Sequence, residues 1–187
     1  MKRELSFSVG CLCELALLVL ALLWGCLFHR SALANLHWSL SCTLIGIAAA
    51  IPPFTFFRWT LKSNLLVFIH HRHLMESLVL PIFGKWSILQ LAIISILAGI
   101  SEEAFFRGAL QGSLTGYIGV PGALVLASLL FAATHPITWT YAIIVAFIGA
   151  YLGLLWIWTG NLLTPMVTHA VYDFAALVYC LRVCRSS

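Results

Sequence analysis

Charged residues are scarce in this sequence, and their scarcity excludes most classes of soluble protein. Only 9% of the 187 residues are charged, whereas 62% are hydrophobic and the mean hydropathy is +1.03. Soluble globular domains carry about 25% charged residues. We therefore expect an integral membrane protein. Its net charge of +4 is attributed to membrane topology, and nothing in the sequence indicates nucleic-acid binding.

Several catalytic patterns are also missing. The six cysteines lack the CxxC pairs of zinc or redox sites and are interpreted as packing residues. The absence of an HExxH motif excludes the usual helix-borne zinc protease site. Asp173 is the only aspartate, so one chain cannot build a two-aspartate protease. Ser113 lacks the setting of a nucleophile elbow, which leaves a serine mechanism weak.

Apolar segments make up most of what is present. A helix needs about 20 apolar residues to cross about 30 Å of hydrocarbon. The predicted spans are 9–28, 38–57, 86–113, 118–135, 140–158 and 162–181. The first is expected to stay as an uncleaved span and not to act as a signal peptide. The sequence thus predicts an all-α fold, a polytopic transmembrane helical bundle of about six spans.

Three regions are distinguished within this bundle. We expect an N-terminal two-span region with a cytoplasmic interfacial loop over 1–85, a helical core over 86–181, and a cytoplasmic tail over 182–187. Three histidines in the loop, His70, His71 and His73, are interpreted as part of an interfacial segment and not as a metal cluster. Pro52 and Pro53 are expected to end or kink the second span, because proline removes an amide donor.

The basic residues predict the orientation of the spans. Cytoplasmic segments carry an excess of Lys and Arg. With both termini in the cytoplasm, only Arg30 falls on the far side and Arg107 lies within the membrane. The remaining basic residues are cytoplasmic: Lys2, Arg3, Arg58, Lys62, Arg72, Lys85, Arg182 and Arg185. We therefore expect cytoplasmic N- and C-termini and, given the short chain, a bacterial inner membrane.

Charged residues inside the third span point to function. An ionisable group in hydrocarbon is costly and by default marks a functional site. Glu103 and Arg107 are four residues apart and share a helix face, which predicts an ion pair. Glu102 points about 100° away. Because it lacks that partner, burial favours its neutral form and suits it to proton transfer. The alternative is that all three residues form a structural clasp between helices.

Two later spans supply histidines. His135 ends the fourth span, at a depth where a returning helix could meet Glu102, although a lone histidine there is usually structural. His169 and Asp173 lie four residues apart in the sixth span and should face the bundle interior. Two carboxylates and two histidines are enough for general-base activation of water and for hydrogen-bond donation to an oxyanion.

The order of these motifs resembles the CPBP family, which comprises CAAX-type prenyl endopeptidases, bacteriocin-processing enzymes and Abi-domain proteins. The resemblance covers about residues 86–181. It rests on three motifs: Glu102-Glu103-x-x-x-Arg107, Phe131-x-x-x-His135 and His169-x-x-x-Asp173. It implies a glutamate-dependent intramembrane endopeptidase with its active site in a core of four helices. The helices would enclose a water-filled cavity that opens towards the cytoplasm.

The resemblance also implies roles for individual residues. The implied catalytic residues are Glu102, His135, His169 and Asp173, and the implied supporting residues are Glu103 and Arg107. Glu102 and His135 would activate the attacking water, and His169 with Asp173 would stabilise the oxyanion. Asp173 departs from the asparagine that well-described prenyl proteases carry at this position. We expect Asp173 to orient His169 and to stabilise its charged form.

Other functions stay open at this point. A zinc-dependent version of the same protease could use Glu102, His135 and His169 as ligands, although no cofactor is expected. A non-catalytic immunity or scaffold protein could keep the polar cluster for helix assembly. A proton-coupled transporter is a further class, but convincing inverted repeats are missing. The expected partners are the lipid bilayer and a membrane-associated peptide or protein substrate, such as a bacteriocin leader, a signalling peptide or another membrane protein.

Overall fold

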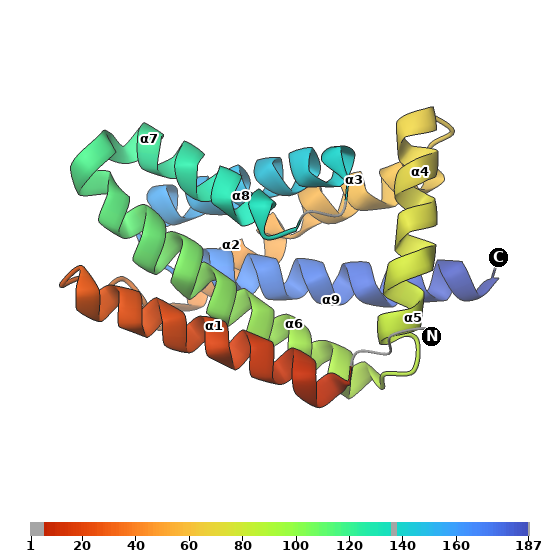
Figure 1. Cartoon of the computed structure of the whole chain (residues 1–187), viewed down its shortest axis with the longest axis horizontal. Helices are drawn as coiled ribbons and strands as arrows, with labels where there is room; N and C mark the ends of the chain where they lie inside the picture. Colours follow the sequence, from red (N-terminus) through yellow and green to blue (C-terminus); the bar gives the residue numbers. More distant parts are fainter. Residues whose placement is uncertain (1–5, 136–137, 187) are drawn as a thin grey trace.

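A computed structural model describes residues 6–135 and 138–186, and these residues form helices and connections without any strand. The elements are α1 (Phe7–Leu27), α2 (Leu40–Ala49), α3 (Ile51–Lys62), α4 (Leu66–Leu74), the π-helix η1 (Met75–Val79), α5 (Leu80–Phe83), α6 (Ile88–Glu103), the π-helix η2 (Ala104–Gln111), α7 (Gly112–Ala133), α8 (Trp139–Thr159) and α9 (Leu163–Ser186). Figure 1 shows their arrangement as one helical bundle, which confirms the predicted all-α class.

Five helical stretches in the described residues are long and apolar enough to cross a membrane. One of them, Ile88–Ala133, is 46 residues long and covers most of both the third and the fourth predicted spans. It turns back at Gly119, whose φ of 70° suits glycine, and Pro121 follows within the bend. The returning part of α7 packs against η2 (Figure 1). The two predicted spans are therefore the limbs of one hairpin in a polytopic bundle.

The returning limb is short. From Val120 to Ala133 it rises about 21 Å, less than the roughly 30 Å of a hydrocarbon core. α7 then ends at Thr134, which caps it. His135, the residue after this cap, is therefore placed within the depth of the bundle, where it lines a cavity between the helices.

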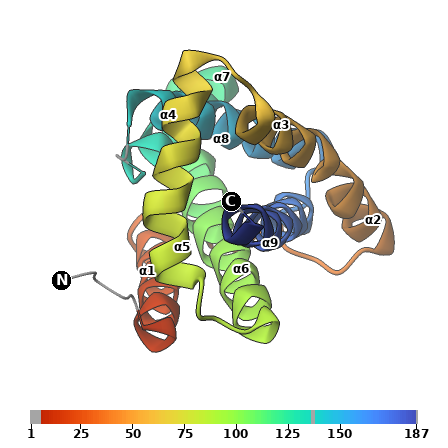
Figure 2. The same ribbon diagram turned by 90° about the vertical axis from the view of Figure 1, so that its right-hand side faces the viewer.

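α9 lies at the centre of the helical packing. It contacts α2, α3, α6 and α8, while α1 packs along α6 and η2 on the outside. Figure 2 shows α9 end-on among these helices. Side chains of α9 are therefore placed to contact residues from both halves of the chain. The predicted boundary at residue 85, between the N-terminal region and the helical core, stays a prediction.

The segment expected to be an interfacial loop is helical. α4, η1 and α5 run across one end of the bundle and cross α9 (Figures 1 and 2). Proline does not interrupt it because Pro81 lies in the first turn of α5, where its missing amide costs nothing. His73 lies 3.6 Å from Glu76 (Nδ1 to Oε2), whereas the side chains of His70 and His71 are outside the described residues.

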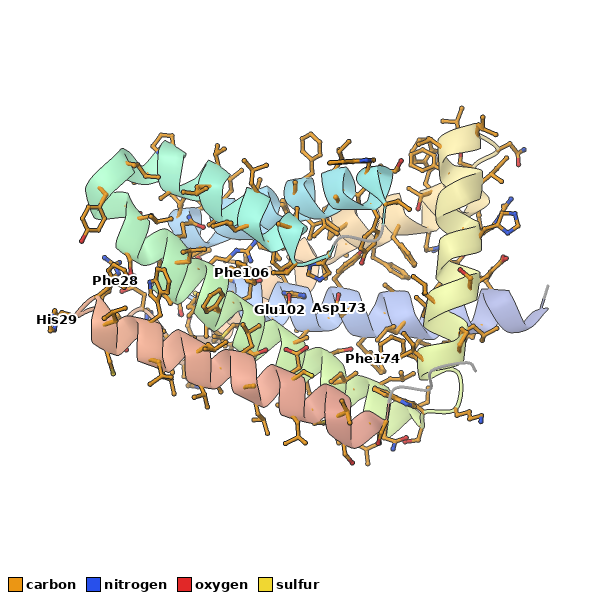
Figure 3. All side chains as sticks on the ribbon, in the orientation of Figure 1. Phe28, His29, Glu102, Phe106, Asp173 and Phe174 are labelled. Carbon is orange, nitrogen blue, oxygen red and sulfur yellow. The ribbon has the colours of Figure 1, made fainter. Side chains whose placement is uncertain are left out.

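The break in the second span occurs where the prolines predict it. α2 ends at Ala49 and α3 begins at Ile51 with proline in its first turn. The C-terminal end of α9, helix α4 and the first turn of α1 lie at the same end of the bundle, while His29 lies at the opposite end (Figures 1 and 3). The cytoplasmic location of the first end stays a prediction, and Lys2, Arg3 and the side chain of Arg185 are outside the described residues.

The outer surface is apolar, as expected for a protein in lipid. Leucine, isoleucine, phenylalanine and tryptophan side chains are exposed along most spans. Trp139, the first residue of α8, is 88% exposed, and Trp158, the last but one, is 71% exposed. Tryptophan gathers at membrane–water interfaces, so these two side chains mark the two ends of α8.

Candidate active site

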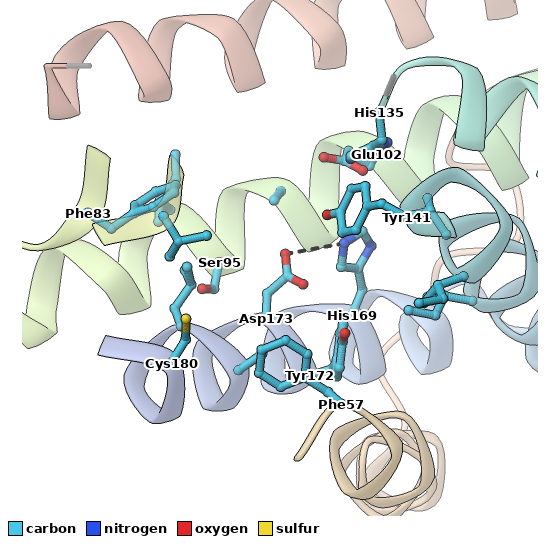
Figure 4. A pocket seen from close by; sticks show the side chains of 18 of the residues that line it. Phe57, Phe83, Ser95, Glu102, His135, Tyr141, His169, Tyr172, Asp173 and Cys180 are labelled. Atoms are coloured by element: carbon cyan, nitrogen blue, oxygen red, sulfur yellow. Dashed lines mark ion pairs between the residues drawn. The ribbon is translucent and has the colours of Figure 1, made fainter. Parts of the chain in front are cut away.

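A cavity of about 360 Å³ opens between the helices, and all four predicted catalytic residues line it: Glu102, His135, His169 and Asp173. They come from α6, from the residue after the α7 cap, and from α9 (Figure 4). Glu103 and Arg107 are not among the lining residues and lie behind the cavity wall, with side-chain exposures of 0% and 1%. The fold therefore brings together residues that are up to 71 positions apart in sequence, from Glu102 to Asp173.

The helix that carries the glutamates changes its winding next to them. α6 ends at Glu103 and the π-helix η2 begins at Ala104. π-helical segments are rare and frequently occur at functional sites. Almost every residue of η2 is buried, including Arg107 and Gln111. The π-helix thus coincides with the place where polar side chains are buried in the core. The sequence analysis did not predict this π-helix.

The predicted ion pair is present. Arg107 Nη1 donates to Glu103 Oε1 at 3.1 Å. Its Nη2 donates to the Gly149 carbonyl oxygen at 2.6 Å, and its guanidinium carbon lies 4.7 Å from the ring centre of Phe131. A close cation–ring contact of this kind is favourable, especially when water is excluded. Arg107 therefore connects α6, α7 and α8 through one side chain.

His169 is held between two carboxylates. Its Nδ1 lies 2.9 Å from Glu103 Oε1, and its Nε2 lies 3.4 Å from Asp173 Oδ2. The contact with Asp173 was predicted from the four-residue spacing, but the contact with Glu103 was not. An ionised carboxylate can only accept a hydrogen bond. Where both acids are ionised, both ring nitrogens therefore carry hydrogen and His169 is an imidazolium.

The Nε2 atom of His135 has no hydrogen-bond partner among the residues that the structure describes. Its Nδ1 lies 2.9 Å from the Phe131 carbonyl oxygen and 3.1 Å from Thr134 Oγ1. A carbonyl oxygen accepts only, so the contact with Phe131 is a hydrogen bond when Nδ1 carries the hydrogen. This tautomer leaves a lone pair on Nε2. The residue is half-buried and lines the cavity, so this lone pair can serve as a proton acceptor there.

Glu102 differs from Glu103 as the helix geometry predicts. Glu103 is engaged by both Arg107 and His169. Oε2 of Glu103 is buried without a hydrogen-bond partner among the described residues, and so is Oε2 of Glu102. The difference is that Glu102 forms no hydrogen bond or ion pair with a cation or histidine among those residues and faces the cavity. A buried polar atom without a partner is rare and costly. An uncommitted carboxylate oxygen beside a cavity is available to bind water or a polar substrate group.

Comparison with known proteins identifies a family that part of this chain resembles. Residues 84–175 match the family described as Type II CAAX prenyl endopeptidase Rce1-like. This region, just under half of the chain, is similar to that family. The predicted resemblance to CAAX-type enzymes is thereby confirmed. The six predicted site residues all fall within the Rce1-like region, although the family match does not test their individual roles.

One curated relative is the Bacillus subtilis (strain 168) protein described as "Uncharacterized protein YpbD". The two chains are 41% identical over 95 residues, which is 49% of this chain and 46% of the relative. The match therefore spans about half the length of each chain. No solved structure matches this chain.

Sequence reasoning missed residues that line the cavity, both within the matched residues 84–175 and outside them. Glu14 of α1 lines the cavity, outside the matched region, and Tyr141 and Tyr172 line it from α8 and α9. A signal for Glu14 was present, because it is an acidic residue inside the first apolar span. The tyrosines carry no comparable signal, since aromatic residues are common throughout the spans.

The arrangement does not suit the zinc set of Glu102, His135 and His169. Among the described residues, no group of three His, Cys, Asp or Glu side chains is placed to hold a metal ion. A zinc ligand must offer a ring nitrogen lone pair. Both ring nitrogens of His169 face carboxylates, and where both acids are ionised each nitrogen carries a hydrogen and offers no lone pair. The Rce1-like site is therefore better arranged for acid–base chemistry by its own side chains.

Proposed function

We propose that this protein is a membrane-embedded endopeptidase that hydrolyses a peptide bond with water activated by Glu102 and His135. The main support is the unpartnered carboxylate oxygen of Glu102 on a cavity that it shares with two histidines. The Rce1-like region supports the same class of reaction. Its residues supply a base, a second proton acceptor and a hydrogen-bond donor, which are the groups that amide hydrolysis needs.

In the proposed first step, Glu102 takes a proton from a cavity water while His135 Nε2 holds the same water through a hydrogen bond. The water oxygen attacks the carbonyl carbon, and the carbonyl π electrons move to its oxygen. Glu102 then returns the proton to the amide nitrogen. The carbon–nitrogen bond breaks, and a carboxyl end and an amine end are released. No external oxidant or co-reactant is needed.

The developing negative charge would be stabilised by the His169 side chain. The contact of its Nε2 with Asp173 is long at 3.4 Å, so the N–H of Nε2 is weakly engaged there and stays available to an oxyanion in the cavity. Glu103 fixes the opposite nitrogen, and Arg107 balances the charge of Glu103. We assign Glu103 and Arg107 as supporting residues, and Asp173 as the group that orients His169 and favours its charged form.

The cavity walls favour a membrane-associated peptide or protein as the substrate. Apart from the polar cluster, the cavity is lined mostly by apolar side chains from α3, α5, α6, α8 and α9. Such walls suit an extended apolar segment. We further propose a bacterial inner membrane with both termini in the cytoplasm. Residues 86–181 would then be the catalytic core and 182–187 a cytoplasmic tail.

The test compares peptides in membranes that carry the wild type, Glu102→Ala or His135→Ala. We expect uncut precursor to accumulate with both variants while the folded protein is retained. Glu76→Ala is the matched control, because Glu76 does not line the cavity and its side chain forms an ion pair with the exposed His73. Normal turnover by Glu102→Ala would refute the assignment.

A non-catalytic scaffold or immunity protein is the second candidate. The observation that favours it is the buried network of Glu103, Arg107 and His169, which joins four helices without needing a substrate. Glu102→Gln distinguishes the two functions. This variant should lose biological activity if the protein is an endopeptidase, and it should keep that activity if the polar cluster serves only helix assembly.

A further inference from the structure

Glu14 is an acidic side chain on the cavity that the proposed mechanism does not use. It lies in the second turn of α1, which packs along α6 (Figures 1 and 2). The residue is half-buried and lines the same cavity as Glu102. An acidic residue inside an apolar span is costly and needs a functional or structural reason.

One hydrogen bond fixes the Glu14 carboxylate. Ser101, the residue before Glu102, donates its hydroxyl to Glu14 Oε2 at 2.5 Å. Within the described residues Glu14 has no ion pair. A short hydrogen bond to a carboxylate holds the side chain in place but leaves its charge unbalanced. Glu14 is thus positioned at the level of Glu102 and is not neutralised by a neighbouring cation.

Acidic side chains outnumber permanently charged basic ones among the residues that line the cavity. No Lys or Arg is among its lining residues, whereas Glu14, Glu102 and Asp173 are. Arg107 lies behind the wall and is taken up by Glu103. Of the two histidines, His169 is already held by two acids. Together with the unpartnered Oε2 of Glu102, this excess of acid makes the cavity complementary to a positive charge.

We propose that Glu14 is a specificity-determining residue that selects peptide segments carrying a lysine or arginine side chain beside the bound peptide bond. This role builds on the proposed endopeptidase and narrows its substrate class. The cationic side chain would pair with Glu14 while the apolar walls take the rest of the segment. An acidic side chain or a free C-terminal carboxylate at the same place would face repulsion and bind poorly.

Binding of defined peptides tests the proposal without depending on turnover. The protein carries Glu102→Gln and is placed in nanodiscs of neutral phosphatidylcholine, which removes attraction to lipid charge. The probes are three apolar peptides with acetylated and amidated ends, identical except for a central lysine, norleucine or glutamate. We expect the lysine peptide to bind about tenfold more tightly than the norleucine peptide, and the glutamate peptide to bind most weakly.

Two further variants separate charge from structure. Glu14→Gln keeps the size of the side chain and an oxygen that can accept from Ser101, but it removes the charge. It should abolish the preference for lysine while leaving the affinity of the norleucine peptide unchanged. Ser101→Ala removes the hydrogen bond and keeps the charge, so the preference should largely persist. Equal loss of affinity for all three peptides with Glu14→Gln would show a merely structural role.

The outcomes distinguish this proposal from the proposed function. Equal binding of the lysine and norleucine peptides, or a preference that survives Glu14→Gln, would overturn the role of Glu14. If cleavage that depends on Glu102 is also found, the endopeptidase assignment stands without it. A preference for lysine that depends on Glu14, in a protein that cleaves nothing, would refute the endopeptidase and keep Glu14 as a selector of cationic segments.

Discussion

Replacing Glu103 by alanine should lower the free energy of unfolding by about 3–5 kcal/mol, because it leaves a buried charge without its partner. Arg107 is 1% exposed, and its Nη1 loses the acceptor at 3.1 Å. The Gly149 carbonyl and the Phe131 ring remain in contact with the guanidinium, but neither carries the negative charge that balances it. The loss of the hydrogen bond to His169 acts in the same direction.

A double variant provides the control. Glu103→Leu combined with Arg107→Met removes both charges and keeps apolar volume in the core. Replacing a buried ion pair by apolar residues is often neutral, or stabilising by about 1–4 kcal/mol. We therefore expect the double variant to regain most of the stability that Glu103→Ala loses. It should nevertheless stay impaired in catalysis, because His169 Nδ1 no longer faces a carboxylate.

Unfolding in mixed micelles with increasing dodecyl sulfate, followed by circular dichroism, measures both effects. Peptide cleavage by the same preparations separates stability from activity. The reasoning fails if Glu103→Ala unfolds within about 0.5 kcal/mol of the wild type, the range of ordinary surface substitutions. It also fails if the double variant is as unstable as Glu103→Ala, since the unpaired charge would then not be the cause.

Three further predictions concern the site and its packing. Asp173→Asn should keep the rate of peptide cleavage within about tenfold of the wild-type rate, because the amide oxygen can still accept a hydrogen bond from His169. Complete loss of cleavage would mean that the carboxylate itself takes part in the reaction. Gly108→Ala should lower the free energy of unfolding in micelles by about 1–3 kcal/mol or more, because an added Cβ would overlap the Ala32 carbonyl oxygen. Gly116→Ala is the control and should leave the free energy of unfolding unchanged, because the space around Gly116 is open. Treatment of the purified protein with a chelator should leave cleavage unchanged, and restoration by added zinc after such treatment would contradict the acid–base assignment.

The sequence predicts contacts within one helix much better than contacts between helices. The pairs Glu103 with Arg107 and His169 with Asp173 follow from four-residue spacing on a helix face, and both are present. The contact between Glu103 and His169 joins residues 66 positions apart, and it depends on how α6 packs against α9. No periodicity in a single sequence encodes that packing.

Local backbone geometry is also beyond sequence reasoning. The π-helix after Glu103 and the positive φ at Gly119 arise in a stretch whose composition is that of an ordinary apolar helix. The polar residues of the histidine-bearing segment before Lys85 predict a loop, yet this segment forms α4, η1 and α5. Glu14 was overlooked although the rule that singled out Glu102 applies to it equally.

The tryptophans at the two ends of α8 set the depth at which chemistry can occur. Trp139 and Trp158 are about 28 Å apart along the helix, close to the thickness of the hydrocarbon layer. His135 precedes Trp139 by four residues, a stretch that reaches at most about 14 Å. The imidazole of His135, the proposed proton acceptor, is therefore confined to the single leaflet that Trp139 borders. Water needs to penetrate only that leaflet, and a bond at the far side of the bilayer lies beyond the reach of His135.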